Sequence, residues 1–116
     1  MKRIHTLALV ACIASSLWSF SASANEAHRR ISAMDETQRQ EYFSVFLYRS
    51  EERCGLVTRT FFQGLDKKGD AYWNLACANG KSYMVSIAND AKGSSKILGC
   101  EFLKAINAGS CFKKFR

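Results

Sequence analysis

Histidine is scarce in this chain, and its scarcity limits the chemistry that the protein can perform. Only two of the 116 residues are histidines. His5 lies in an apolar leader, and His28 lies near the start of the chain that follows it. A Ser-His-Asp or Cys-His catalytic site therefore requires that His28 folds back onto the domain. The carboxylates Asp66, Asp70 and Asp90 fit turn positions better than acid–base roles. We predict a protein that is not an enzyme.

Motifs for redox, haem, metal and phosphate chemistry are also missing. The chain has no Cys-x-x-Cys pair, which excludes a thioredoxin-type site, and no Cys-x-x-Cys-His sequence for haem attachment. Its cysteine spacings match no zinc module. No glycine-rich phosphate loop follows a predicted strand. We therefore expect no metal and no cofactor.

The first 24 residues have the pattern of a secretory signal peptide. Lys2 and Arg3 give a positive start, and residues 6–20 are apolar apart from serine and threonine. Small residues at 22–24 suit a signal peptidase, and the apolar run is too short to favour a membrane span. The pattern predicts a protein that is exported, either periplasmic or secreted, with a single domain over residues 25–116.

A second interpretation of the leader is a lipid anchor. Leu9-Val10-Ala11-Cys12 resembles a bacterial lipobox, which would place a lipid on Cys12. Two features argue against it. The apolar run before Cys12 is short, and the chain stays apolar after it, where an anchored protein would have a polar tether.

The charge of the chain is moderately basic. The full sequence carries a net charge of +7, and removal of Lys2 and Arg3 leaves 15 basic against 10 acidic residues, or +5. This charge either keeps a small protein soluble or attracts anionic envelope polymers and lipid headgroups. Export argues against nucleic acid as a partner.

One amphipathic helix is predicted over residues 35–53. Asp35 and Gln38 form a capping-box pattern at its start, and apolar residues cluster over two turns from Tyr42 to Leu47. The chain contains no proline that would interrupt it. Gly55 is placed to end it.

A sheet is predicted over about residues 56–100. Four segments, 56–64, 71–77, 81–88 and 95–100, read as strands separated by turns rich in Gly, Asp, Asn and Lys. Alternation predicts two inward-facing sets, which are Trp73, Leu75 and Cys77 on one strand and Tyr83, Val85 and Ile87 on the next. The fold class is therefore α+β, with the N-terminal helix on a four-stranded antiparallel meander and a C-terminal tail over residues 101–116.

Four cysteines follow the leader, namely Cys54, Cys77, Cys100 and Cys111. An even number in a short exported chain predicts two disulfide bonds. In a meander the first three gather at one end of the sheet. Cys77 and Cys100 would lie two strands apart, about 9–10 Å, which is too far for a disulfide. Of the three possible connectivities we predict 54–77 with 100–111, on an inferred strand order and register.

The middle of the chain carries turn and strand residues in a characteristic order. These residues are Asn79-Gly80, Tyr83, Val85, Ile87, Asp90 and Gly93. In this order, over about residues 71–98, the chain resembles the PepSY family. The resemblance implies an exported or envelope-associated binding module, of a kind thought to restrain peptidases. The four cysteines depart from the family pattern.

An aromatic surface is the first candidate for binding. A single helix covers one face of the sheet. On the other face alternation places Tyr72, either Phe61 or Phe62, and Arg59, which are residue types enriched at interfaces. The alternative is that the segment from residue 102 to 112 folds across this face and covers it.

A basic tail is the second candidate. Four basic residues lie near the C-terminus, namely Lys104, Lys113, Lys114 and Arg116. They form either a binding group or an ordinary solvated tail. The sequence therefore predicts a module that binds or modulates an unidentified envelope protein, such as a peptidase. The alternative function is binding to an anionic polymer or to lipid headgroups through the basic residues.

Cleavage of the exported protein is expected after Ala24, because residues 22–24 have the small side chains that signal peptidase accepts. The intact mass of the exported protein should correspond to a chain that begins at Asn25. A product that begins at Cys12 with added acyl mass would establish the lipid-anchored form instead.

Overall fold

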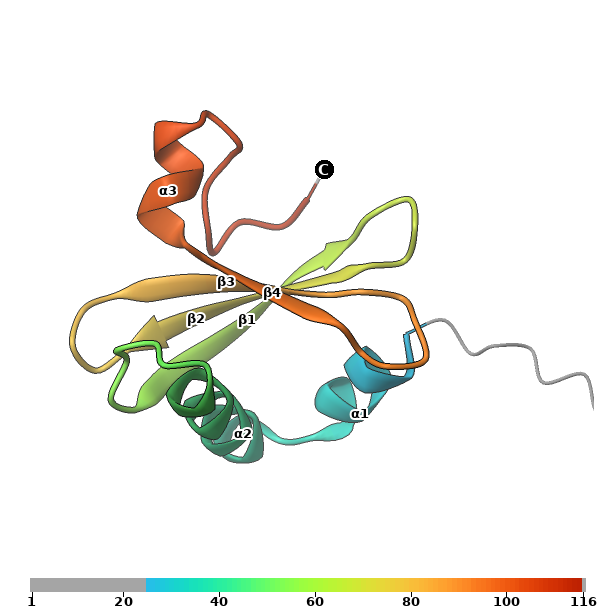
Figure 1. The fold of residues 1–116 in the computed structure, drawn as a ribbon, viewed down its shortest axis with the longest axis horizontal. Helices are drawn as coiled ribbons and strands as arrows, with labels where there is room; N and C mark the ends of the chain where they lie inside the picture. Colours follow the sequence, from blue (N-terminus) through green and yellow to red (C-terminus); the bar gives the residue numbers. More distant parts are fainter. Residues whose placement is uncertain (1–24, 116) are drawn as a thin grey trace, which may run out of the picture.

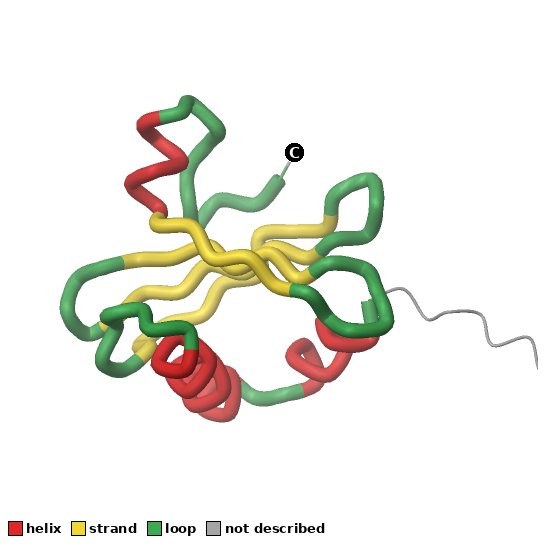
Figure 2. Tube along the Cα trace, in the orientation of Figure 1, coloured by secondary structure: helices red, strands yellow, loops and turns green. Residues whose placement is uncertain are grey.

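The computed structural model describes residues 25–115 and has three layers (Figures 1 and 2). Two helices cover one face of a four-stranded sheet, and a C-terminal segment with a short helix lies on the other face. The elements are α1 (Glu26–Ala33), α2 (Glu36–Arg49), β1 (Val57–Leu65), β2 (Ala71–Cys77), β3 (Ser82–Ile87), β4 (Ser95–Gly99) and α3 (Cys100–Ala105). The strand order β1-β2-β3-β4 is antiparallel throughout, which confirms the predicted α+β meander. The predicted signal peptide lies outside the described residues.

Helix α2 begins where the sequence predicts. The Asp35 side chain accepts a hydrogen bond from the backbone N–H of Gln38, and the Gln38 side chain accepts one from the N–H of Asp35. This reciprocal capping box satisfies two amide groups that a helix start would otherwise leave unpaired. Phe43 and Leu47 point into the core and are fully buried.

The end of α2 differs from the prediction. The helix stops at Arg49 and does not reach Arg53. Glu51 adopts a left-handed conformation with φ of 62°, which turns the chain out of the helix. Gly55 therefore does not end the helix. A non-glycine residue in this conformation leaves no signal in the sequence, because glycine is the residue that normally marks it.

The residues that precede α2 form a second helix, α1, which lies before the helix predicted over residues 35–53. Asn25 caps it by accepting a hydrogen bond from the N–H of His28, and its side-chain amide donates to the carbonyl of Ile87 at 2.8 Å. Asn25 is only 2% exposed, and Ile31 is buried in the core. Contacts with distant strands thus stabilise a helix that its own polar sequence does not predict.

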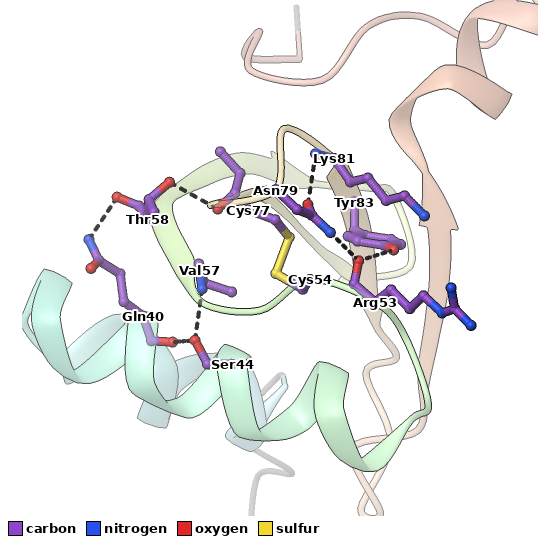
Figure 3. The surroundings of a disulfide bond; sticks show 11 residues. Gln40, Ser44, Arg53, Cys54, Val57, Thr58, Cys77, Asn79, Lys81 and Tyr83 are labelled. Carbon is purple, nitrogen blue, oxygen red and sulfur yellow. Dashed lines mark hydrogen bonds between the residues drawn. A yellow bond between two sulfur atoms is a disulfide. The ribbon is translucent and has the colours of Figure 1, made fainter.

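Side chains of α2 form hydrogen bonds with backbone groups of the edge strand β1 (Figure 3). Glu36 accepts from the N–H of Thr60 at 2.8 Å, Gln40 donates to the carbonyl of Thr58 at 3.1 Å, and Ser44 accepts from the N–H of Val57 at 2.8 Å. These three side chains are spaced four residues apart, so they form one row along the helix. They satisfy backbone groups that an edge strand would otherwise present to another chain.

The core lies between the sheet and the two helices. Both predicted inward-facing sets are buried, and Trp73 packs 6.0 Å from Phe43 of α2, measured between ring centroids. Phe62 of β1 adds to this layer, 5.2 Å from Trp73. The side-chain alternation that the sequence indicated for β2 and β3 is thus confirmed.

Both predicted disulfide bonds are present, Cys54–Cys77 and Cys100–Cys111, with Cα separations of 5.1 and 5.8 Å. The register explains the first pair, because Val57 at the start of β1 lies opposite Cys77 at the end of β2. The carbonyl of Arg53, next to Cys54, also accepts hydrogen bonds from the side chains of Asn79 and Tyr83 (Figure 3). The segment between α2 and β1 is therefore held both covalently and by hydrogen bonds.

Replacing both Cys54 and Cys77 by alanine should lower the free energy of unfolding by about 3 kcal/mol, because the bond closes a loop with a sequence separation of 23. Urea unfolding of the oxidised wild-type and the double variant, followed by tryptophan fluorescence, measures the difference. Equal unfolding midpoints would show that this disulfide has no structural role.

Candidate functional site

The predicted binding residues of β1 and β2 lie on different faces of the sheet. Phe61 lies opposite Asn74, and together with Arg59 it lies on the face away from α1 and α2, which we call the outer sheet face. Phe62 points the other way and stacks on His28, with ring centroids 4.6 Å apart. Phe61 is therefore the phenylalanine that accompanies Tyr72 on the outer sheet face.

Residues 110–115, which we call the C-terminal strap, cross the outer sheet face (Figure 1). A buried amide pair holds the strap, in which Asn74 donates to Gln63 at 3.2 Å. Asn74 also accepts from the N–H of Phe112 at 2.7 Å, and Gln63 donates to the carbonyl of Ser110 at 3.0 Å. Asn74 points away from the helices as alternation predicts, but it is 0% exposed because the strap covers it.

A β-bulge in β1 lies where the end of the strap contacts the sheet. The register of β1 against β2 shifts between Phe62 and Gly64, so Gln63 and Gly64 together face Tyr72. The ring of Phe115 lies against Gly64, where an added Cβ would come within 2.7 Å of it. The same ring contacts Tyr72 edge-on at 5.2 Å. Gly64 thus provides the space that Phe115 occupies.

Tyr72 is consequently half-buried and is bonded within the protein. Its hydroxyl donates to the Asp66 carboxylate at 2.9 Å. Burial, together with this hydrogen bond, raises the pKa of Tyr72 to about 12. Of the two alternatives left by the sequence, the structure shows the covered face, although the covering residues are 110–115 and not the whole of 102–112. We therefore do not retain Tyr72 as the centre of an exposed aromatic surface.

The strap places basic groups above the aromatic rings. The Arg59 guanidinium lies 4.7 Å from the ring centre of Phe112 and 5.7 Å from that of Phe61. The Lys114 ammonium lies 5.6 Å from the Phe61 ring and 4.7 Å from the Phe62 ring. Contacts between cations and ring faces orient these side chains without neutralising their charge. Arg59 and Lys114 are therefore held in place and remain exposed.

A groove of about 660 Å³ lies beside the strap. It runs between the turn that joins β2 to β3, the start of α3, and the strap, and both Cys100 and Cys111 line it. Its basic lining residues are Lys81, Lys104 and Lys113, and its acidic lining residue is Glu101. The volume is in the range of small-ligand sites, and the lining favours an anion.

These cations together form what we call the basic face, made of Arg59, Lys81, Lys104, Lys113 and Lys114. None of the five has a carboxylate within ion-pair distance among residues 25–115. The sequence identified Arg59, Lys104, Lys113 and Lys114 as candidates. It missed Lys81, because only the fold brings the β2–β3 turn next to α3 and the strap.

His28 does fold back onto the domain. Its Nδ1 accepts a hydrogen bond from the indole N–H of Trp73 at 3.0 Å, and its Nε2 lies 3.3 Å from the hydroxyl oxygen of Ser32. Because Nδ1 is the acceptor, the neutral ring carries its proton on Nε2. Nε2 therefore donates to the hydroxyl oxygen of Ser32. It has no free lone pair with which to accept the proton of that hydroxyl group. In this arrangement His28 does not activate Ser32 as a nucleophile.

No family model, curated protein or solved structure matches the chain. The resemblance to the PepSY family remains a prediction. Within residues 25–115, no three His, Cys, Asp or Glu side chains gather in a way that would hold a metal ion. None of the helices in that part of the chain is both long and apolar enough to span a membrane.

The partly buried position of His28 should make the stability of the protein depend on pH. Burial lowers the pKa of His28 below its ordinary value of 6.5. The unfolded chain therefore takes up the proton first, so the stabilisation is complete above pH 6.5 and is lost as the pH falls through the lower pKa of the folded state. The free energy of unfolding should decrease from pH 7 to pH 5 in the wild-type and change less in His28→Gln.

Urea titrations at both pH values test this expectation. Glu36, Asp66 and Asp90 have pKa values lowered from 4.5 or 3.8, so their contributions change at more acidic pH. Identical pH dependence in the two proteins would show that His28 does not titrate on folding.

Proposed function

We propose that this protein is a small exported module of the cell envelope that binds an anionic polymer through its basic face and has no enzymatic activity. The observation that carries the proposal is the group of five cations without carboxylate partners around the C-terminal strap. A group of uncompensated positive charges attracts a chain of phosphates or carboxylates over several ångströms. The groove adds a concave surface in which part of such a ligand is sheltered from water.

One feature of the structure supports export, and a second is compatible with it. The two disulfides fit an oxidising compartment outside the cytoplasm. Cleavage after Ala24 would make Asn25 the first residue of the chain. The backbone nitrogen of Asn25 donates a hydrogen bond to the side-chain oxygen of Asn89 at 2.5 Å. A new terminal ammonium at Asn25 could donate the same bond. The proposed processing is thus compatible with the anchoring of α1.

Binding to an envelope protein, as the resemblance to the PepSY family implies, remains the other prediction from the sequence. The surface that this role would use was the aromatic outer sheet face. The strap occupies much of that surface through Phe112 and Phe115. Phe115 stays 45% exposed there. The cations of the basic face are exposed as well and have no carboxylate partner among residues 25–115, which supports an anionic ligand.

Replacing Lys113 and Lys114 by glutamine should weaken binding to an anionic surface by about thirtyfold, at about 1 kcal/mol for each lysine removed. The measurement is co-sedimentation of the purified protein with vesicles that contain phosphatidylglycerol, and retention on immobilised polyphosphate. Binding of the wild-type should also fall steeply as salt is added. Stronger retention on polyphosphate than on vesicles would identify a polymer as the ligand, and the reverse would identify lipid headgroups.

The matched control is Lys92→Gln/Lys96→Gln, which removes the same charge from exposed positions outside the basic face. This control should bind nearly as well as the wild-type. If both double variants lose the same affinity, binding depends on net charge alone and the proposed basic face has no special role. If the wild-type binds neither surface, the proposal is wrong.

A further inference from the structure

Helix α2 carries a second apolar surface on the side away from the sheet. Phe43 and Leu47 are buried against the core, whereas Val45 between them is 50% exposed. Each is two positions from Val45, which is about 200° around a helix, so Val45 points directly outward. Tyr42 and Tyr48 flank it and are 42% and 82% exposed. The helix therefore has apolar side chains on two opposite sides, only one of which the chain itself covers.

The outward side of α2 is also hollowed. A groove of about 700 Å³ runs along it, lined by Met34, Tyr42, Val45 and Phe46 with Glu41 and Arg49 among its polar residues. Apolar side chains along a groove indicate a surface that a partner can fill. A helix lies well in such a groove, because its side chains project at the spacing of the ridges of α2.

Two opposite charges lie at equal distances on either side of Val45. Glu41 precedes it by one turn, and Arg49 follows it by one turn. Eight residues separate these charges, about 12 Å along the helix, so they cannot pair with each other. Neither has an ion pair with any other residue in the described part of the chain. The outward side of α2 thus carries one free negative and one free positive group, arranged symmetrically about an apolar centre.

We propose that the outward side of α2 binds the same surface of a second copy of this chain, as an antiparallel helix pair with a two-fold axis at Val45. This symmetry places Val45 against Val45 of the second copy. It also places Glu41 opposite Arg49 of the second copy, and Arg49 opposite Glu41 of the second copy. A two-fold interface repeats each contact twice, so the single pattern on α2 supplies both ion pairs.

The charge pattern makes a second copy of α2 a complementary partner. An unrelated partner would need the opposite order of charges, whereas an antiparallel copy of α2 has it by symmetry. The contact is short, because 14 residues of α2 extend about 21 Å. An interface of this size is below that of permanent complexes, so the dimer forms reversibly and depends on concentration.

The dimer would leave the basic face accessible. Helix α2 and the C-terminal strap lie on opposite sides of the sheet (Figure 1). The inference is therefore independent of the proposed anionic ligand, and a failure of one leaves the other standing.

Sedimentation equilibrium of the purified oxidised protein, from micromolar to millimolar concentration at low salt, tests the proposal. The wild-type should shift from monomer towards dimer over this range. Glu41→Arg alone and Arg49→Glu alone place like charges opposite each other twice, and each should weaken dimerisation by about tenfold or more. The combined Glu41→Arg/Arg49→Glu variant restores opposite pairs and should recover dimerisation.

Glu101→Arg is the matched control, because it makes the same charge change on the other side of the sheet. It should dimerise like the wild-type. All of these positions are exposed, so the variants should keep the wild-type melting temperature. A wild-type that stays monomeric up to millimolar concentration would overturn the proposal, as would a double variant that stays as weak as the single ones.

Discussion

The arrangement of the outer sheet face depends on one buried hydrogen-bonded pair, the side-chain amides of Asn74 and Gln63. Amides removed from water must find partners, because an unpaired buried polar group is costly. These two bond each other, and their remaining groups bond the backbone of residues 110 and 112. The strap is thus held to the sheet by the requirement to satisfy these amides. The aromatic contacts of Phe112 and Phe115, and the placement of the strap lysines, follow from it.

The elements that could be predicted are those whose signals are local. The Asp35 capping box, the alternation on β2 and β3, and the turn residues between strands gave the α2 start, the meander and both disulfide pairs. Helix α1 could not be predicted in this way, because it depends on bonds between Asn25 and Ile87 and between His28 and Trp73. These partners are 62 and 45 residues apart in the chain, beyond the reach of any pattern of neighbours.

Most of the charged residues of the candidate site could be predicted from the sequence, whereas the burial of its aromatic residues could not. Lys113, Lys114 and Arg59 stand out in the sequence because basic residues are seldom buried. Tyr72 lies on the predicted face, but its cover could not be decided from the sequence, because alternation gives the face on which a side chain lies and not what covers that face. The cover depends on the bulge at Gln63 and on the bare backbone of Gly64. The bulge, and the contact of Phe115 with Gly64, form only in the folded protein.

The two disulfides join different parts of the fold, so each has a separate structural role. Cys54–Cys77 ties the end of the α2 connection to the sheet, so it supports the core side of the molecule. Cys100–Cys111 joins the first residue of α3 to the strap, and both cysteines line the basic groove. The two walls of that groove are therefore covalently connected. The bond closes a loop with a sequence separation of only 11, which leaves the chain little freedom. Oxidation of the second pair therefore restrains the backbone that carries Lys104 relative to the backbone that carries Lys113.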